Sequence, residues 1–160
     1  MSRLLRAGLL TAVTDGLFSS VLVVAAYGST VTRLWQGVAS VLLGPGAFDG
    51  GLRTVLVGLA MHVAVAFTWS AVFLVLVRRA SWLRQLVGSR YGVLKAAAVY
   101  GPLVWVVMSI VVIPLLVRRP PAINFRWWVQ LVGHFPFVGL PIVAGIGLPS
   151  LRSLSRGAKP

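Results

Sequence analysis

Four long apolar segments, separated by arginine-rich stretches, constrain the fold of this chain most strongly. They cover residues 4–27, 55–77, 94–117 and 127–148. Each is close to the roughly 20 residues that an α-helix needs to cross about 30 Å of hydrocarbon. The sequence therefore predicts an all-α integral membrane protein, a four-helix transmembrane bundle that forms a single domain over residues 1–160.

The composition and the placement of charge agree with this fold class. Only 11% of the residues are charged, whereas about a quarter are charged in a typical soluble domain. The net charge is +13, and the basic residues flank the apolar segments, as Arg78 and Arg79 do. This placement predicts contact with anionic lipid headgroups, and it disfavours nucleic acid as a partner.

Several classes of chemistry are excluded by residue types that the chain lacks. It has no cysteine and no glutamate, and Asp15 and Asp49 are its only acids. Disulfides, iron–sulfur clusters and cysteine-based zinc sites are therefore impossible. The sequence also contains no nucleophile elbow, no zinc-protease motif and no phosphate-binding loop. We predict no catalytic residue and no metal site, and we favour a non-enzymatic role.

Between the first two apolar segments, residues 30–43 have an amphipathic pattern. Apolar side chains share one helical face and polar side chains another: Val31, Leu34, Trp35, Val38, Val41 and Leu42 against Arg33, Gln36 and Ser40. The pattern predicts a short interfacial helix between spans 1 and 2. Two interpretations stay open: a connector that lies on the membrane surface, or a lid or wall over a cavity.

Tryptophan and arginine predict where the chain meets the membrane interface. Trp35, Trp82, Trp127 and Trp128 are the expected interfacial anchors. The expected contacts with anionic lipid are Arg78, Arg79, Arg84, Arg90 and Lys95, in the loop after the second span. Counting the basic tail at 152–160, the side that carries both termini holds ten basic residues against five on the other. The positive-inside rule then places both termini in the cytoplasm.

The first span has one alternative interpretation. Arg3 and Arg6 precede an apolar run, and Val24-Ala25-Ala26 resembles a signal-peptide cleavage site. The run is longer than a typical signal-peptide core, however, and it contains Asp15. We therefore expect an uncleaved first span.

Small residues and prolines predict how the spans pack. Ala60, Ala64 and Thr68 are four apart in the second span, and Ala97 and Gly101 are four apart in the third. Small residues at this spacing allow close helix contact. The fourth span contains several glycines and prolines and is expected to bend and to contact the other three.

Three ionisable residues lie inside the predicted spans: Asp15, His62 and His134. The helical rise places Asp15 roughly 15 Å from one end, and both histidines roughly 10–12 Å from the other. All three are expected to meet, with Ser109 at a similar level. An isolated acid within a membrane costs about 2.5–3.5 kcal/mol on insertion scales, so Asp15 needs a partner.

This cluster of polar residues admits three interpretations. It is a hydrogen-bonded plug that keeps the helices in register, or a site that handles protons or a solute, or a haem site. In the last case His62 and His134 are the axial ligands of a b-type haem in an electron-transfer protein. The plug corresponds to a subunit of a membrane assembly, either homo-oligomeric or with a membrane-protein partner. The proton or solute site corresponds to a minimal transporter. No cofactor is favoured.

Four blocks of the sequence resemble a group of small four-span bacterial membrane proteins with no assigned activity. The blocks are residues 37–51 (GVASVLLGPGAFDGG), 58–73 (GLAMHVAVAFTWSAVF), 108–115 (MSIVVIPL) and 133–144 (GHFPFVGLPIVA). The likeness covers most of the chain except the basic tail. It implies a multi-pass protein of the bacterial inner membrane and transfers no functional residue.

Overall fold

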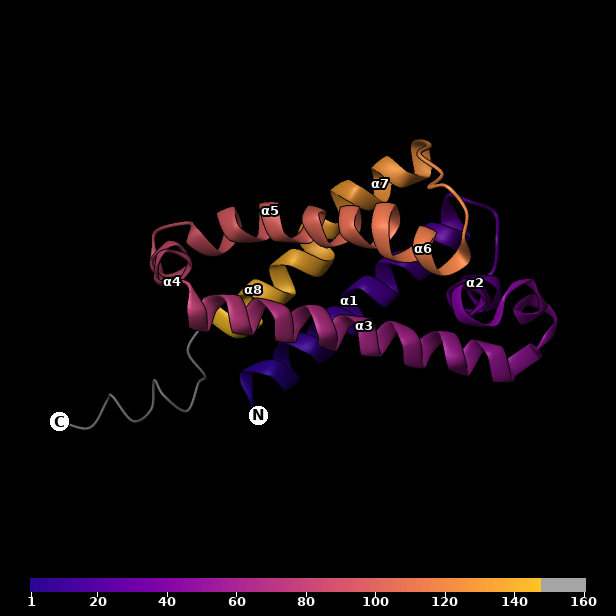
Figure 1. Ribbon diagram of the computed structural model, residues 1–160, viewed down its shortest axis with the longest axis horizontal. Coiled ribbons are helices and arrows are strands. Elements are labelled where there is room, and N and C mark those ends of the chain that lie inside the picture. Colours follow the sequence, from indigo (N-terminus) through magenta and orange to yellow (C-terminus); the bar gives the residue numbers. More distant parts are fainter. Residues whose placement is uncertain (148–160) are drawn as a thin grey trace.

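The computed structural model describes residues 1–147, and every regular element in this part of the chain is helical (Figure 1). The predicted basic tail, 152–160, lies outside the described residues. The helices are α1 (Arg3–Ala25), α2 (Val31–Leu43), η1 (Pro45–Asp49), α3 (Gly51–Arg79), α4 (Ser81–Gly88), α5 (Gly92–Val106), η2 (Val107–Val112), α6 (Ile113–Val117), α7 (Phe125–His134), η3 (Phe135–Gly139) and α8 (Leu140–Gly147).

Four continuous helices are long and apolar enough to cross a membrane. They are Arg3–Ala25, Gly51–Arg79, Gly92–Val117 and Phe125–Gly147. The prediction of four such helices is therefore confirmed. The second begins four residues earlier than predicted, because the turn at η1 ends at Asp49 and α3 starts at Gly51.

The short helices mark the two ends of the molecule. In Figure 1, α4 lies at one end and α2 with α6 at the other, and the N-terminus lies in the half nearer α4. These ends are called the α4 end and the α2 end below. Helix α4 contacts α3, α5 and α8, and α2 contacts α1, α3 and α6. The two short helices therefore cover opposite ends of the four long ones.

A tightly packed core fills the half of the bundle nearer the α4 end. Phe73 of α3 is 1% exposed, and Ile142 and Ile146 of α8 are 0% exposed. Tyr100 of α5 packs on Phe73, and its hydroxyl donates a hydrogen bond of 2.7 Å to the Trp69 carbonyl oxygen. Its one polar side-chain group is thus paired, and this half of the bundle leaves little room for water or a ligand.

Glycines let the long helices touch backbone to backbone. A Cβ at Gly101 would collide with the His134 carbonyl oxygen, and one at Gly139 would collide with the Ala97 carbonyl oxygen. A Cβ at Gly145 would lie 2.7 Å from Ala7 Cα. These contacts bring the fourth span against both α5 and α1, as its glycine-rich sequence predicted.

The third and fourth spans each change helical pitch near their middle. Val107–Val112 and Phe135–Gly139 are π-helical, and Pro136 lies inside the second of these segments. Proline has no N–H to donate, so the regular helical ladder is interrupted there. Pro141 also lacks an N–H, so the Phe137 carbonyl four residues before it is free to accept a 2.7 Å hydrogen bond from the Thr14 hydroxyl of α1. The expected bend of the fourth span therefore takes the form of a π-helical segment tied to α1.

Two sequence-based details differ from the structure. The small-residue face of α3 at Ala60, Ala64 and Thr68 does not face the bundle, since Ala60, Ala64 and Thr68 are all exposed. The buried face of α3 instead carries Gly58, Ala66, Ser70 and Phe73. On α2, Gln36 of the predicted polar face is only 5% exposed, and its side-chain amide donates a 3.5 Å hydrogen bond to the Gly51 carbonyl oxygen.

The backbone contact at Gly101 gives a test of the packing. Gly101→Ala should destabilise the protein by about 1–3 kcal/mol, because the methyl group has no room against the His134 carbonyl. Gly37→Ala is the matched control in α2. A Cβ there meets only Phe48 Cζ at 4.0 Å, and the better helix propensity of alanine should stabilise the protein by about 0.5–1 kcal/mol. Thermal unfolding in detergent, followed by circular dichroism, measures both. Equal stability of Gly101→Ala and wild type would contradict the packing described.

Candidate functional site

A cavity of about 310 Å³ lies among the long helices and is closed on one side by α2. Its polar lining consists of Thr11, Asp15, Ser19, His62, Gln130 and His134. Three tryptophans, Trp35, Trp69 and Trp105, line it as well, and the remaining lining residues are aliphatic or methionine. Thus α1, α2, α3, the third span and the fourth span all contribute side chains. The interpretation of residues 30–43 as a wall over a cavity matches this arrangement, since Leu34, Trp35 and Val38 face it.

Asp15 and His62 meet at this cavity, as the sequence predicted. His62 Nδ1 lies 3.8 Å from Asp15 Oδ2. His62 Nε2 lies 3.0 Å from the Ala12 carbonyl oxygen, which is only able to accept. Nε2 therefore carries a proton, and a neutral His62 presents the lone pair of Nδ1 to Asp15.

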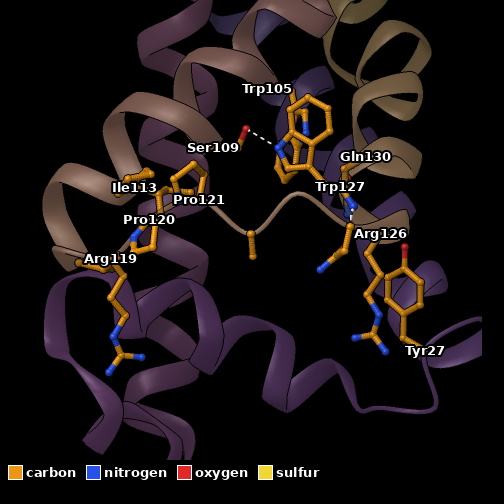
Figure 2. Close-up of a pocket in the computed structure, with 14 residues that line it drawn as sticks. Tyr27, Trp105, Ser109, Ile113, Arg119, Pro120, Pro121, Arg126, Trp127 and Gln130 are labelled. Atoms are coloured by element: carbon orange, nitrogen blue, oxygen red, sulfur yellow. Dashed lines mark hydrogen bonds between the residues drawn. The ribbon is translucent and has the colours of Figure 1, made fainter.

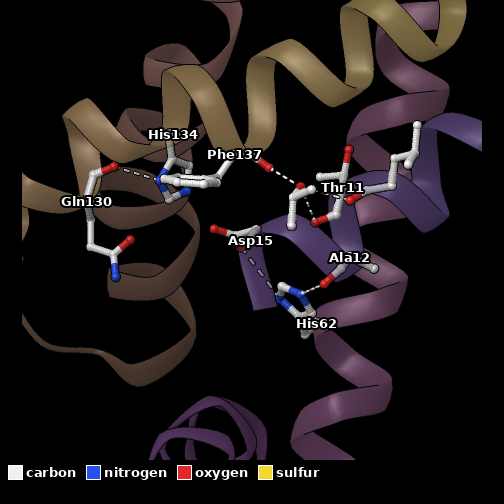
Figure 3. Close-up of polar contacts among 9 residues, drawn as sticks. Thr11, Ala12, Asp15, His62, Gln130, His134 and Phe137 are labelled. Carbon is white, nitrogen blue, oxygen red and sulfur yellow. Dashed lines mark hydrogen bonds and ion pairs between the residues drawn. The ribbon is translucent and has the colours of Figure 1, made fainter. Parts of the chain in front are cut away.

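His134 approaches Asp15 from the opposite side, so that Asp15 lies between the two imidazole rings (Figure 3). His134 Nδ1 lies 2.7 Å from the carbonyl oxygen of Gln130, one turn earlier on α7. This contact requires the proton on Nδ1 and leaves the lone pair on Nε2. His134 is 8% exposed, so that lone pair has little access to solvent.

Several polar atoms at the cavity have no hydrogen-bond partner among the described residues. They are Asp15 Oδ1, Thr11 Oγ1 and Trp105 Nε1. A buried polar group without a partner costs about 1–3 kcal/mol. Their concentration around one cavity marks it as a place where a bound species would be stabilised by hydrogen bonds.

Tryptophan rings lie against both histidines. The ring centroids of Trp35 and His62 are 5.1 Å apart, and those of Trp105 and His134 are 4.8 Å apart. The face of an indole ring attracts cations, so both rings favour positive charge at this place. Together with the carboxylate of Asp15, they make the surroundings of the cavity more favourable to positive than to negative charge.

Ser109 does not line this cavity. Its hydroxyl accepts a 2.9 Å hydrogen bond from Trp127 Nε1, and both residues line a neighbouring pocket of about 420 Å³ (Figure 2). The π-helical turn of the third span directs Ser109 toward α7 instead of toward Asp15. Trp105, Ile113 and Gln130 line both pockets, so they form the partition between them.

The neighbouring pocket has a basic rim near the α2 end. Arg119 and Arg126 line it, and Figure 2 shows their side chains on the same side of the α6–α7 loop. Arg126 lies 4.2 Å from the centroid of the Tyr27 ring. No acidic residue lines this pocket in the part of the chain that the structure describes. A cation entering here would therefore be repelled.

The predicted interfacial residues fall into two groups. Trp82 and Trp128 are 66% and 55% exposed, as interfacial anchors are expected to be. Trp35 and Trp127 are 6% and 8% exposed and point into the protein, because one closes the cavity and the other bonds to Ser109. The predicted lipid contacts are all exposed at the α4 end: Arg78, Arg79, Arg84, Arg90 and Lys95.

Sequence reasoning missed Thr11, Gln130 and the tryptophans of the cavity. Thr11 and Gln130 each lie four residues before a predicted site residue, Asp15 and His134, and so share a helical face with it. That spacing was a usable signal. The positions of Trp69 and Trp105 gave no such signal, since a tryptophan in a span is more often an ordinary packing residue.

The structure offers no arrangement suited to a metal ion or a haem. The described residues contain no group of three or more metal-ligating side chains. A haem ligand must direct a nitrogen lone pair at the iron, but His62 Nε2 faces the Ala12 carbonyl and His62 Nδ1 faces Asp15. The two histidines as placed therefore do not fit axial ligation.

Comparison with known proteins adds no family to this description. No protein-family model, characterised protein or solved structure matches the chain. The fold and the cavity therefore define the chain only by class: a four-helix protein whose long helices suit a membrane and surround a carboxyl–histidine site. Its resemblance to small bacterial four-span proteins stays a prediction.

The two histidines give a direct spectroscopic test of the site. They are the only histidines in the chain, so protein labelled with ¹⁵N-histidine yields two resolvable rings. At a pH where both are neutral, we expect the Nε2–H tautomer for His62 and the Nδ1–H tautomer for His134. The variant His62→Gln assigns the signals. The same tautomer at both rings would contradict the described hydrogen bonds.

An absorption spectrum tests the haem alternative separately. Protein purified gently from its own membrane should show no Soret band and no reduced α-band, because both nitrogens of His62 are directed elsewhere. A Soret band that disappears in His62→Ala or His134→Ala would reverse this conclusion.

Proposed function

We propose that this chain is a small multi-pass membrane transporter that exchanges protons at a site formed by Asp15, His62 and His134. The observation that carries the proposal is the convergence of hydrogen-bond acceptors in the cavity. Ionised Asp15 offers only lone pairs, and neutral His62 and His134 each direct one lone pair toward this region. Such a group of acceptors binds protons or another cation, and carboxylate–histidine chains serve as proton relays in membranes.

The interior of the bundle is tightly packed at one end and contains a cavity toward the other. This difference favours transport over a purely structural role. The cavity lies toward the α2 end, and the tight core around Phe73, Ile142 and Ile146 closes the α4 end. A site that lies nearer one end and is separated from the other by packed side chains suits one state of an alternating-access cycle. The π-helical segments beside the cavity, which contribute Met108 and Val138 to its lining, are the elements best suited to rearrange.

The membrane setting completes the proposal. The four long helices cross the bacterial inner membrane, with both termini and the α4 end in the cytoplasm. The exposed arginines of the α3–α4 region then contact anionic headgroups. In this orientation the cavity opens toward the periplasm.

A role as a subunit of a larger assembly is the second candidate. It is favoured by the exposed face of Ala60, Ala64 and Thr68, since small residues four apart permit close contact with another membrane helix. A stoichiometric membrane-protein partner that co-purifies in mild detergent would support this role. A monodisperse monomer would remove it.

Proton movement in liposomes tests the proposed function. The protein is reconstituted around a pH-sensitive dye, and a potassium gradient with valinomycin sets the membrane potential. Wild type should acidify or alkalinise the lumen according to the sign of the potential. Asp15→Asn should behave like protein-free liposomes, because it removes the ionisable group between the two histidines.

Asp49→Asn is the matched control, since Asp49 is the other acid of the chain and lies exposed on η1. It should conduct as wild type does. If wild type moves no protons, or if Asp15→Asn moves as many as wild type, proton exchange at this site is refuted. The cluster then acts as a structural plug.

A further inference from the structure

We propose that the solute bound in this cavity is a lipophilic amine in its ammonium form, held by Asp15 and by the tryptophan faces. The proposal rests on the proposed function, because the ammonium takes the place of the proton at the same carboxylate. It names the class of substrate that the cavity recognises.

The hydrogen-bonding groups of the cavity match an ammonium ion. Asp15 Oδ1 is buried without a partner, and His134, whose Nε2 keeps a lone pair, lines the same cavity. An N–H donor placed between them satisfies both, and a hydrogen bond to a charged group is worth about 1.5–3 kcal/mol. An anionic ligand would instead be repelled by the Asp15 carboxylate. A neutral ligand would leave the charge of that carboxylate uncompensated.

The aromatic lining matches a positive charge of moderate size. Trp35, Trp69 and Trp105 come from three different helices and line one cavity of about 310 Å³. Indole faces are the strongest aromatic partners for cations, especially where water is excluded. A cavity lined by one carboxylate and three indoles therefore favours an organic cation, and the described residues hold no metal-ligating cluster that would compete.

The route into the cavity indicates that the amine is lipophilic. The pocket beside Trp105 is rimmed by Arg119 and Arg126, which repel cations. A second neighbour of the cavity is a groove of about 640 Å³ between α2, α3 and α6, and apolar side chains dominate its lining. Val38, Val65, Met108 and Ile113 line both the groove and the cavity.

This groove gives a ligand access to the cavity from the side, between the apolar helices. Its only charged lining residue is Arg33, whose guanidinium lies over the Phe48 ring at 5.6 Å from the centroid. An amine with an apolar body reaches the groove from the bilayer and passes Met108 to reach Asp15. The binding step balances in charge: one R–NH₃⁺ binds, and one proton bound at the Asp15 site is released.

Three probes with the same phenylethyl body test the substrate class on the wild-type protein alone. Phenethylamine, 2-phenylethanol and 3-phenylpropionate share an aromatic body and differ in charge. Binding to the protein in lipid nanodiscs is measured by equilibrium dialysis, with protein-free nanodiscs as the blank. We expect the amine to bind about tenfold or more tighter than the alcohol and the acid not to bind. Equal affinity for amine and alcohol overturns the proposal, and it does so without relying on any variant.

Variants then locate the amine. Asp15→Asn should lose amine binding, and Asp49→Asn should keep it. Trp105→Phe should weaken binding about fivefold, because phenylalanine is a poorer partner for a cation. Undiminished binding to Asp15→Asn that elutes as a monodisperse protein overturns the assignment.

Proton release separates this inference from the proposed function. A pH-sensitive dye in weakly buffered solution should report about one proton released for each amine bound. Amine binding without proton release would keep the amine site and refute proton exchange. Proton movement in liposomes without selective amine binding would keep proton exchange and refute the amine.

Discussion

A carboxyl group placed midway along an apolar helix is the constraint on which the arrangement of this protein depends. Asp15 lies in α1 among leucine, valine and alanine, where an unpartnered charge costs several kcal/mol. Two histidines flank it, one on α3 and the other on α7 (Figure 3). To deliver them, three helices must lie in one register. The site therefore exists only when the helices of the bundle lie in this register.

Backbone contact holds that register. Gly101 of α5 and Gly139 of the fourth span have no side chains to keep these two helices apart, and Gly145 brings the fourth span against Ala7 of α1. The Arg6 side chain adds hydrogen bonds of 2.9 and 2.6 Å to the Gly145 carbonyl oxygen. The helices are in close contact near the α4 end, and the fourth span is π-helical beside Asp15. The space between the helices therefore lies toward the α2 end. The cavity thus follows from where small residues and a proline fall along the spans.

Much of this could be predicted from the sequence. The length of the apolar segments predicted the four long helices. The separation of apolar and polar residues onto two helical faces predicted α2. Depth along each span predicted the meeting of Asp15, His62 and His134, because the helical rise is constant. The direction that each residue faces around its helix axis was predicted less well. Ser109 and Ala64 lie at suitable depths but face other directions, and Trp35 turns inward instead of lying at the interface.

These failures share a physical cause. Apolar residues surround every span, so hydropathy does not distinguish the face toward lipid from the face toward protein. A π-helical segment also shifts the face of every residue after it, and local sequence indicates its position poorly. Only the ionisable residues had a required direction, since lipid excludes them, and they were the ones placed together successfully.

The most direct test of the proposed one-sided access to the cavity is cysteine accessibility in sealed membrane vesicles of known orientation. The chain has no cysteine, so each introduced thiol is unique. Ser19 lines the cavity, and Ser70 is 0% exposed within α3. Ser19→Cys should react with a membrane-impermeant maleimide from the α2 side alone, and Ser70→Cys from neither side. Reaction of Ser19→Cys from the α4 side, or from neither side in folded protein, would contradict the account.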